Sequence, residues 1–81
     1  MREEIKTRLT AVFRKVFKDN SIEIQDQTTA NDIERWDSLT HLVLIQSAEE
    51  EFGIKFKLKE LIAMKNVGDF ISGIELKLQA K

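Results

Sequence analysis

The chain has 81 residues, a formal net charge of −1, no cysteine and no proline. This length predicts a single domain, 1–81, with a small core and no room for a deep enzyme cleft. The absence of cysteine excludes disulfides, a thiolate nucleophile and thiolate metal sites. Small secreted domains usually need disulfides, and no apolar run approaches the roughly 20 residues that cross a membrane, so we expect a cytoplasmic protein.

The charges are unevenly distributed along the chain. Residues 1–18 carry a net charge of +4, residues 19–54 a net charge of −8, and residues 55–81 a net charge of +3. An acidic centre argues against nucleic acid, which requires a continuous basic face. It favours a basic protein partner that electrostatic steering brings to the surface.

Residues 2–17 predict an amphipathic helix. Its apolar residues recur on one helical face: Ile5, Leu9, Val12, Phe13 and Val16. Asp19-Asn20 then breaks the pattern. Residues 19–37 form a long connection, and connections of this length are often functional. We expect Ile22, Ile24 and Ile33 to strap it across a helical bundle, with one short helical turn at 32–35.

Residues 38–52 predict a second helix, capped by Asp37 or Ser38 and ended by Gly53 at the C′ position. The predicted buried face contains Leu39, Leu42, Ile45, Ala48 and Phe52. Residues 49–51 are three glutamates near the end of this helix, where negative charge is unfavourable. They are either a solvated charge run or a surface for partner recognition.

The remaining residues predict a short extended segment at 54–56, a short helix at 58–64 and a final helix. Leu58, Leu61 and Ile62 are expected to face inward. Asn66 is the predicted N-cap of the final helix, and Asp69 completes a capping box. The apolar face of that helix contains Val67, Phe70, Ile71, Ile74 and Leu78. The predicted fold is all-α: a small four-helix bundle of three main helices and one short helix, with a long loop between helices 1 and 2.

The motif Asp37-Ser38-Leu39 at a loop–helix junction, followed one helix later by residues 49–53 (EEEFG) and 54–56 (IKF), resembles the acyl carrier protein family. The resemblance covers the whole chain. It implies that Ser38 carries 4′-phosphopantetheine, which a phosphopantetheinyl transferase attaches from Mg²⁺-bound coenzyme A. It also implies that Asp37 helps to orient that substrate, and that Leu39 is partly exposed and docks into a partner.

The chain departs from the pattern of fatty-acid-synthesis carriers, in which the outer face of helix two is acidic. Here that face carries Thr40, Val43 and Gln46, and Arg35-Trp36 precede the motif. The sequence looks more like free-standing carriers of specialised pathways, such as polyketide, modified-lipid or surface-polysaccharide synthesis. We expect a monomer that is not an enzyme and whose partners are the transferase and acyl-loading, acyl-transfer or condensing enzymes. The residues predicted to recognise these partners are Trp36, Thr40, Leu42, Val43, Gln46, Glu49 and Glu50.

Several alternatives remain open from the residues alone. Taken alone, Ser38 would be a plain N-cap, because serine caps are common, and only the agreement of the whole chain with the family favours its modification. Ser38 and His41 share a helix face, as a hydrolase would need, but Asp37 is badly placed to orient the imidazole. His41 is otherwise expected to face solvent or a partner. Trp36 either packs the loop onto the bundle or anchors a partner.

Two further alternatives concern ligands and partners. The loop carboxylates of Asp32, Glu34 and Asp37 are a weak candidate for a metal site. The competing function is an unmodified helical interaction domain that binds a basic partner through residues 19–54.

Overall fold

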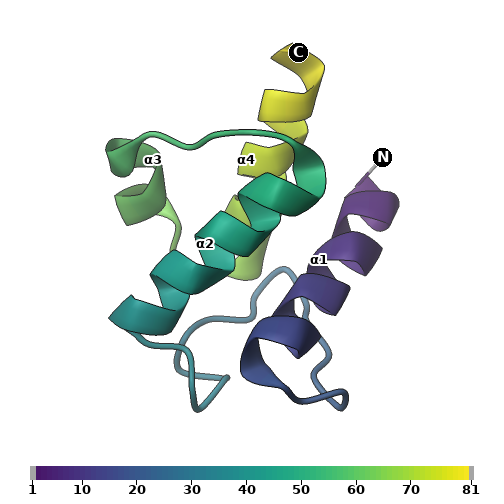
Figure 1. Ribbon diagram of the computed structural model, residues 1–81, viewed down its shortest axis with the longest axis vertical. Coiled ribbons are helices and arrows are strands. Elements are labelled where there is room, and N and C mark those ends of the chain that lie inside the picture. Colours follow the sequence, from purple (N-terminus) through teal and green to yellow (C-terminus); the bar gives the residue numbers. More distant parts are fainter. Residues whose placement is uncertain (1, 81) are drawn as a thin grey trace.

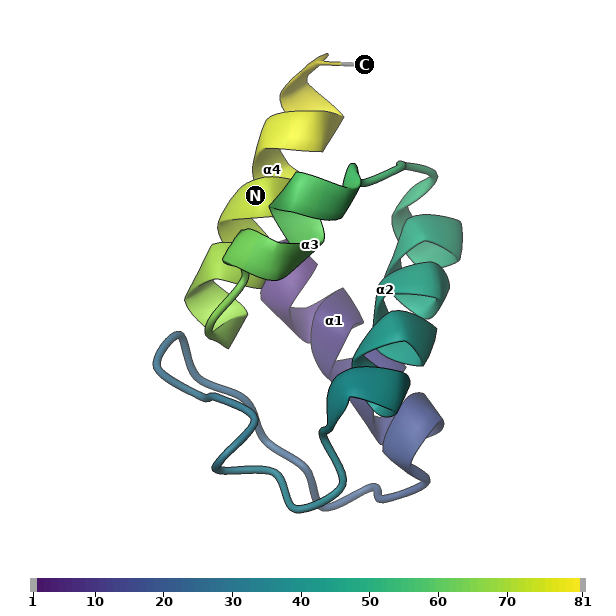
Figure 2. The same cartoon turned by 90° about the vertical axis from the view of Figure 1, so that its left-hand side faces the viewer.

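The computed structural model describes residues 2–80, which form four helices: α1 (Arg2–Phe17), α2 (Ser38–Phe52), α3 (Leu58–Ala63) and α4 (Val67–Ala80). Figure 1 shows that the long connection between α1 and α2 runs across one end of the bundle. In the perpendicular view α3 lies in front of α4, and α2 lies to its right (Figure 2). Residues 2–80 contain no strand. The prediction of an all-α bundle with one short helix is therefore confirmed.

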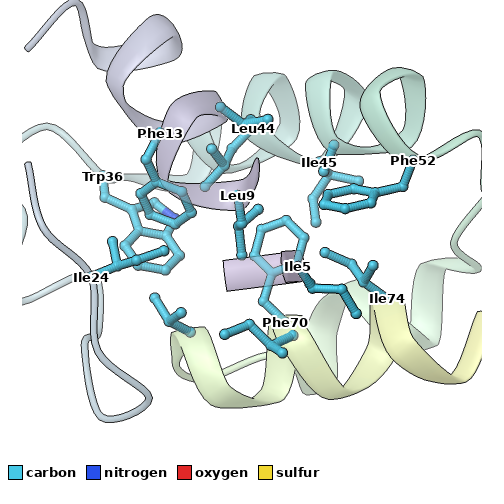
Figure 3. Packing of buried hydrophobic residues seen from close by; sticks show 14 of the residues in the cluster. Ile5, Leu9, Phe13, Ile24, Trp36, Leu44, Ile45, Phe52, Phe70 and Ile74 are labelled. Atoms are coloured by element: carbon cyan, nitrogen blue, oxygen red, sulfur yellow. The ribbon is translucent and has the colours of Figure 1, made fainter. Parts of the chain in front are cut away.

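The core lies between α1, α2 and α4, and the loop adds two side chains to it (Figure 3). Its largest fully buried side chains include Phe13 from α1, Leu44 from α2 and Phe70 from α4. The predicted inner face of α1 is correct except at its end, where Phe17 is buried and Val16 only partly so. Every buried residue within 2–80 is apolar, so the fold depends on packing rather than on buried polar networks.

The inner face of α2 differs from the prediction. Leu44 is 0% exposed and replaces Leu39 and Leu42, which are 73% and 56% exposed. Ile45, Ala48 and Phe52 are buried as predicted. Successive residues of a helix are rotated by about 100°, so a face centred on residues 44, 48 and 52 directs Leu39 to the opposite side. The prediction failed because apolar residues surround the first half of this helix, and periodicity alone does not select one face.

Both α1 and α2 end in the same way. Gly53 has a positive φ of 65°, and the Ile54 N–H donates to the Glu49 carbonyl over 3.1 Å. At the end of α1, Lys18 has a φ of 54°, and the Asp19 N–H donates to the Arg14 carbonyl, also over 3.1 Å. These are the bonds of a Schellman motif, which favours glycine at the left-handed position. The predicted role of Gly53 is confirmed.

The long connection is held at both its apolar and its polar groups. Ile24 is buried, and Ile22 and Ile33 pack partly against the core, as predicted. The Val67 N–H donates to the Thr28 carbonyl and the Gly68 N–H to the Asp26 carbonyl, both over 2.8 Å. Residues 32–35 form non-helical turns instead of the expected helical turn. The loop is therefore fixed to the start of α4 by backbone bonds.

The short helix α3 has no buried residue, which contradicts the prediction for two of its side chains. Leu58 and Ile62 are strongly exposed, whereas Leu61 packs partly against the core. A helix of six residues offers less than two turns, so one side chain is enough to make its contact.

The start of α4 agrees with the sequence in part. The Asn66 side chain caps it by accepting from the Asp69 N–H over 2.8 Å. The Asp69 carboxylate accepts from the Lys65 N–H, one residue earlier than a capping box requires.

The assignment of the α2 face gives a matched test. Leu44→Ala removes a fully buried side chain and should lower the free energy of unfolding by about 2–5 kcal/mol. Leu42→Ala changes an exposed residue of the same helix and should cost less than about 0.5 kcal/mol. Denaturant unfolding monitored by circular dichroism measures both values. Equal losses in the two variants would contradict the observed orientation of α2.

Candidate functional site

The start of α2 is fixed by a reciprocal cap between Asp37 and Thr40. The Asp37 carboxylate accepts from the Thr40 N–H over 2.9 Å, and the Thr40 hydroxyl accepts from the Asp37 N–H over 2.8 Å. This is a capping box with threonine in the third position. The hydrogen bond from the Thr40 N–H is the main reason that the pKa of the Asp37 carboxyl lies below its usual value. Asp37 is therefore the N-cap, and Ser38 is the first residue of the helix.

Ser38 is exposed at this helix start. Within residues 2–80 its hydroxyl makes no hydrogen bond, because Asp37 performs the capping in its place. The position also lies beside the unpaired N–H groups of the first turn, which favour negative charge. An accessible hydroxyl beside an anion-favouring helix end suits attachment of a phosphate group.

The residue before the cap ties this junction to the core. Trp36 is 7% exposed and packs edge-on against Phe13, with ring centroids 5.2 Å apart. Its indole N–H donates to Nδ1 of His41 over 3.0 Å, and the two rings stack. Of the two roles left open for Trp36, the structure has the packing role, and its side chain is not presented to a partner.

His41 is partly buried and lies next to Trp36 at the start of α2. Because Nδ1 accepts a hydrogen bond from an indole that only donates, the imidazole is neutral with its proton on Nε2. Burial lowers the pKa of His41, and an interaction with the Leu61 backbone acts in the opposite direction. His41 was expected to face solvent or a partner, and its partly exposed ring lies in the groove beside Ser38 while it stacks on Trp36.

A groove of about 510 Å³ opens beside Ser38, between the start of α2 and α3. Its walls are mainly apolar and come from the loop, α2 and α3: Ala30, Trp36, Leu42, Leu58, Leu61, Ile62 and Met64, with Asp37, Ser38, His41 and Lys65 at the polar positions. The α3 residues of the groove were not predicted as part of the site, because Leu58 and Ile62 were expected to be buried. They are distant from Ser38 in the sequence, and only the folded structure brings them to the same groove.

Of the other residues predicted to recognise partners, some are exposed on α2 and one is used within the fold. Leu42, Val43 and Gln46 are exposed on the outer face of α2. The Thr40 hydroxyl is used in the cap and also donates to the Arg35 carbonyl over 2.7 Å. Thr40 is thus a structural residue at this junction.

The three glutamates at the end of α2 do not form one acidic surface. The Glu49 carboxylate accepts from the Phe56 N–H over 2.7 Å, and the Glu51 carboxylate forms an ion pair of 2.8 Å with Arg8. Glu50 is exposed and is the member of this run that has no such contact within residues 2–80. The acidic character expected of this surface is consequently reduced.

The alternatives involving catalysis and metal binding lack the required geometry. His41 Nδ1 is bonded to Trp36, and the Asp37 carboxylate is bonded to the Thr40 amide, so no Ser–His–Asp chain forms. The Asp32 carboxylate accepts from the Thr29 N–H over 2.9 Å. Within residues 2–80, no three potential metal ligands gather at one point. In the same part of the chain, no helix has the length and apolar character needed to span a membrane.

The fold matches that of a known carrier protein. The holo acyl carrier protein of Geobacter metallireducens, solved in solution by NMR, is 49% identical to the chain, with a TM-score of 0.87. The match covers 91% of this chain and 85% of that protein. Neither the models of protein families nor the curated protein sequences give a match. A likeness of this identity and coverage defines the class: this is a carrier protein, not an enzyme. The chain belongs to the acyl carrier protein family.

The neutral state of His41 predicts a pH-dependent stability. The folded pKa lies below the unfolded value, so as pH falls below about 6.5 the unfolded chain binds the proton first and the free energy of unfolding decreases. The decrease should be measurable by denaturant unfolding between about pH 7.5 and pH 5.5, above the range in which carboxyl groups titrate. His41→Gln keeps a hydrogen-bond acceptor for Trp36 and should lose this dependence. His41 is the single histidine of the chain, so an unchanged slope in the variant would refute the assignment.

Proposed function

We propose that this protein carries acyl groups as thioesters on 4′-phosphopantetheine attached to Ser38. The observation that supports this most strongly is the exposed, non-capping hydroxyl at the start of α2, in the Asp37-Ser38-Leu39 motif and beside an apolar groove. When attached, the prosthetic group supplies the thiol that a chain without cysteine lacks. The residues of the protein expose the hydroxyl, accept the phosphate charge and present the arm to partner enzymes.

Attachment requires that the Ser38 oxygen form a phosphodiester with the phosphopantetheine half of coenzyme A. The pyrophosphate bond of coenzyme A breaks, adenosine 3′,5′-bisphosphate leaves with the bonding electrons, and the hydroxyl proton passes to a base of the transferase. In this scheme Asp37 lies next to the reacting hydroxyl. Its carboxyl is ionised at neutral pH, as for an ordinary aspartate, and is available as a partner for the Mg²⁺ that the transferase uses.

The groove beside Ser38 gives the attached acyl chain an apolar surface. Leu42, Leu61 and Met64 line it, so a hydrocarbon chain bound there is shielded from water. The groove lies outside the fully buried core, which includes Phe13, Leu44 and Phe70. A short acyl chain would therefore be accommodated without repacking these side chains.

Partner enzymes are proposed to dock on the outer face of α2. Leu39, Leu42 and Val43 are exposed there, immediately after Ser38, and Gln46 and Glu50 continue the same exposed surface. Leu39 is the most exposed of the three and is the proposed anchor. The expected partners are a phosphopantetheinyl transferase and the enzymes that load, transfer or condense acyl groups, and the carrier is proposed to act as a monomer in the cytoplasm.

The pathway is proposed from the surface chemistry of α2. The part of the outer face next to Ser38 is apolar and uncharged, at Leu39, Leu42 and Val43, and acid appears only towards the end of the helix, at Glu50. This differs from the acidic face expected of fatty-acid-synthesis carriers. This difference favours polyketide, modified-lipid or surface-polysaccharide biosynthesis over housekeeping fatty-acid synthesis.

The attachment is tested by intact mass after incubation with a broad-specificity transferase, Mg²⁺ and coenzyme A. The protein should gain roughly 340 Da, the mass of a covalently attached phosphopantetheine. Ser38→Ala should abolish the gain while keeping its fold, because Asp37 and Thr40 provide the cap. The control is Ser47→Ala, which removes another hydroxyl of α2 and should still be modified. No gain with several transferases, or a gain that survives Ser38→Ala, would overturn the proposal.

The docking surface is tested by the kinetics of the same reaction. Leu42→Ser removes an exposed leucine near Ser38 and should lower the kcat/KM of the transferase by about tenfold, which corresponds to about 1.4 kcal/mol of lost apolar contact. Leu76→Ser changes a comparably exposed leucine on α4 and should leave kcat/KM unchanged. Equal rates for the two variants would show that docking does not use the outer face of α2.

A further inference from the structure

Attachment of a phosphodiester at Ser38 would place a new negative charge beside Asp37, whose pKa is already lowered. The positive end of α2 offsets part of that repulsion. The chain around Ser38 supplies little further positive charge. Arg35, three residues before it, directs its guanidinium to the Phe17 carbonyl over 3.3 Å. A cation from another part of the fold would reduce the remaining repulsion between the phosphate and Asp37.

The groove contains one such cation. Among its lining residues the charged side chains are those of Asp37 and Lys65, and His41 is held neutral by the indole of Trp36. Lys65 follows α3 and is exposed. Within residues 2–80 its ammonium group has no ion-pair partner, whereas the Lys77 ammonium is paired with Glu60 over 2.9 Å. Lys57 and Lys59 belong to the same basic region but do not line the groove.

The position of Lys65 is fixed by its backbone. Its N–H donates to the Asp69 carboxylate over 3.0 Å, so the residue is tied to the first turn of α4. The first turn of α4 also donates backbone hydrogen bonds to Thr28 and Asp26 of the loop. Only the flexible side chain remains free to move, and a lysine side chain provides a compact charge on a long apolar stem.

We propose that Lys65 binds the phosphate of the prosthetic group across the groove from Ser38. Its ammonium group pairs with the non-bridging oxygens of the phosphodiester, and its apolar stem covers the groove beside Met64. This contact directs the arm along the groove between α2 and α3. The inference rests on the proposed attachment to Ser38, and it assigns a positioning role to a residue outside the Asp-Ser-Leu motif.

The test uses the holo protein and two NMR signals of the arm. The ³¹P resonance of the phosphodiester is recorded at low salt and at about 1 M salt, where the screening length falls to roughly 3 Å. Relaxation of the two arm amides is measured with isotopically labelled coenzyme A. In the unsubstituted protein, added salt should shift the ³¹P resonance and increase the motion of the arm. Lys65→Gln should show the high-salt signals at both salt concentrations.

Two control variants separate charge from structure. Lys65→Arg retains the cation and should keep the salt-dependent signals, and Lys59→Gln removes a lysine outside the groove and should also keep them. Signals in Lys65→Gln that equal those of the unsubstituted protein would overturn the inference, as would an equal loss in Lys65→Arg. These results are read only on protein with the mass gain. No mass gain overturns the proposed function and this inference with it, whereas a mass gain with unchanged NMR signals overturns this inference alone.

Discussion

The packing of Trp36 on Phe13 determines where the Ser38 hydroxyl lies. The indole is buried one residue before the cap of α2, and its N–H is bonded to His41 in the first turn of that helix. The end of the long loop and the start of α2 are thereby attached to the core by the same side chain. The capping box between Asp37 and Thr40 then fixes the direction of the helix. The Ser38 hydroxyl is not needed for these contacts, because Asp37 and Thr40 cap the helix and Trp36 binds His41.

The acidic residues in the middle of the chain do not all face solvent as a docking surface, although their distribution along the sequence suggests this. Two of the three glutamates at the end of α2 bind groups of the same molecule: Glu49 binds the Phe56 amide, and Glu51 binds Arg8 of α1. The acidic middle of the sequence therefore stabilises local structure as well as shaping the surface. What α2 leaves exposed next to Ser38 is apolar. The docking proposed for this face would therefore depend more on short-range apolar contact than on long-range steering.

The fold was predictable from the sequence because its signals are local and mutually consistent. Apolar spacing located α1 and α4, Gly53 ended α2, and Asn66 capped α4. The inner face of α2 was not predictable by the same reasoning, since Leu39, Leu42 and Leu44 satisfy the pattern of a buried residue equally well. Packing of α2 against α1 determines that Leu44 is the buried one of the three. The motif containing Ser38 was visible in the sequence, whereas Lys65 was not, because the loop and α4 bring it to the groove through backbone bonds that leave no local pattern.

The position of the groove also bears on how a small domain can hold an apolar cargo. A chain of 81 residues has a small core, so opening that core for an acyl chain would cost a large share of its stability. Here the apolar groove lies outside the fully buried side chains, between α2 and a helix that buries no residue of its own. Movement of α3 would widen the groove while the contacts among α1, α2 and α4 persist. The helix with no buried residue is thus the one that lies beside Ser38, the proposed site of attachment, where acyl groups of different sizes would have to fit.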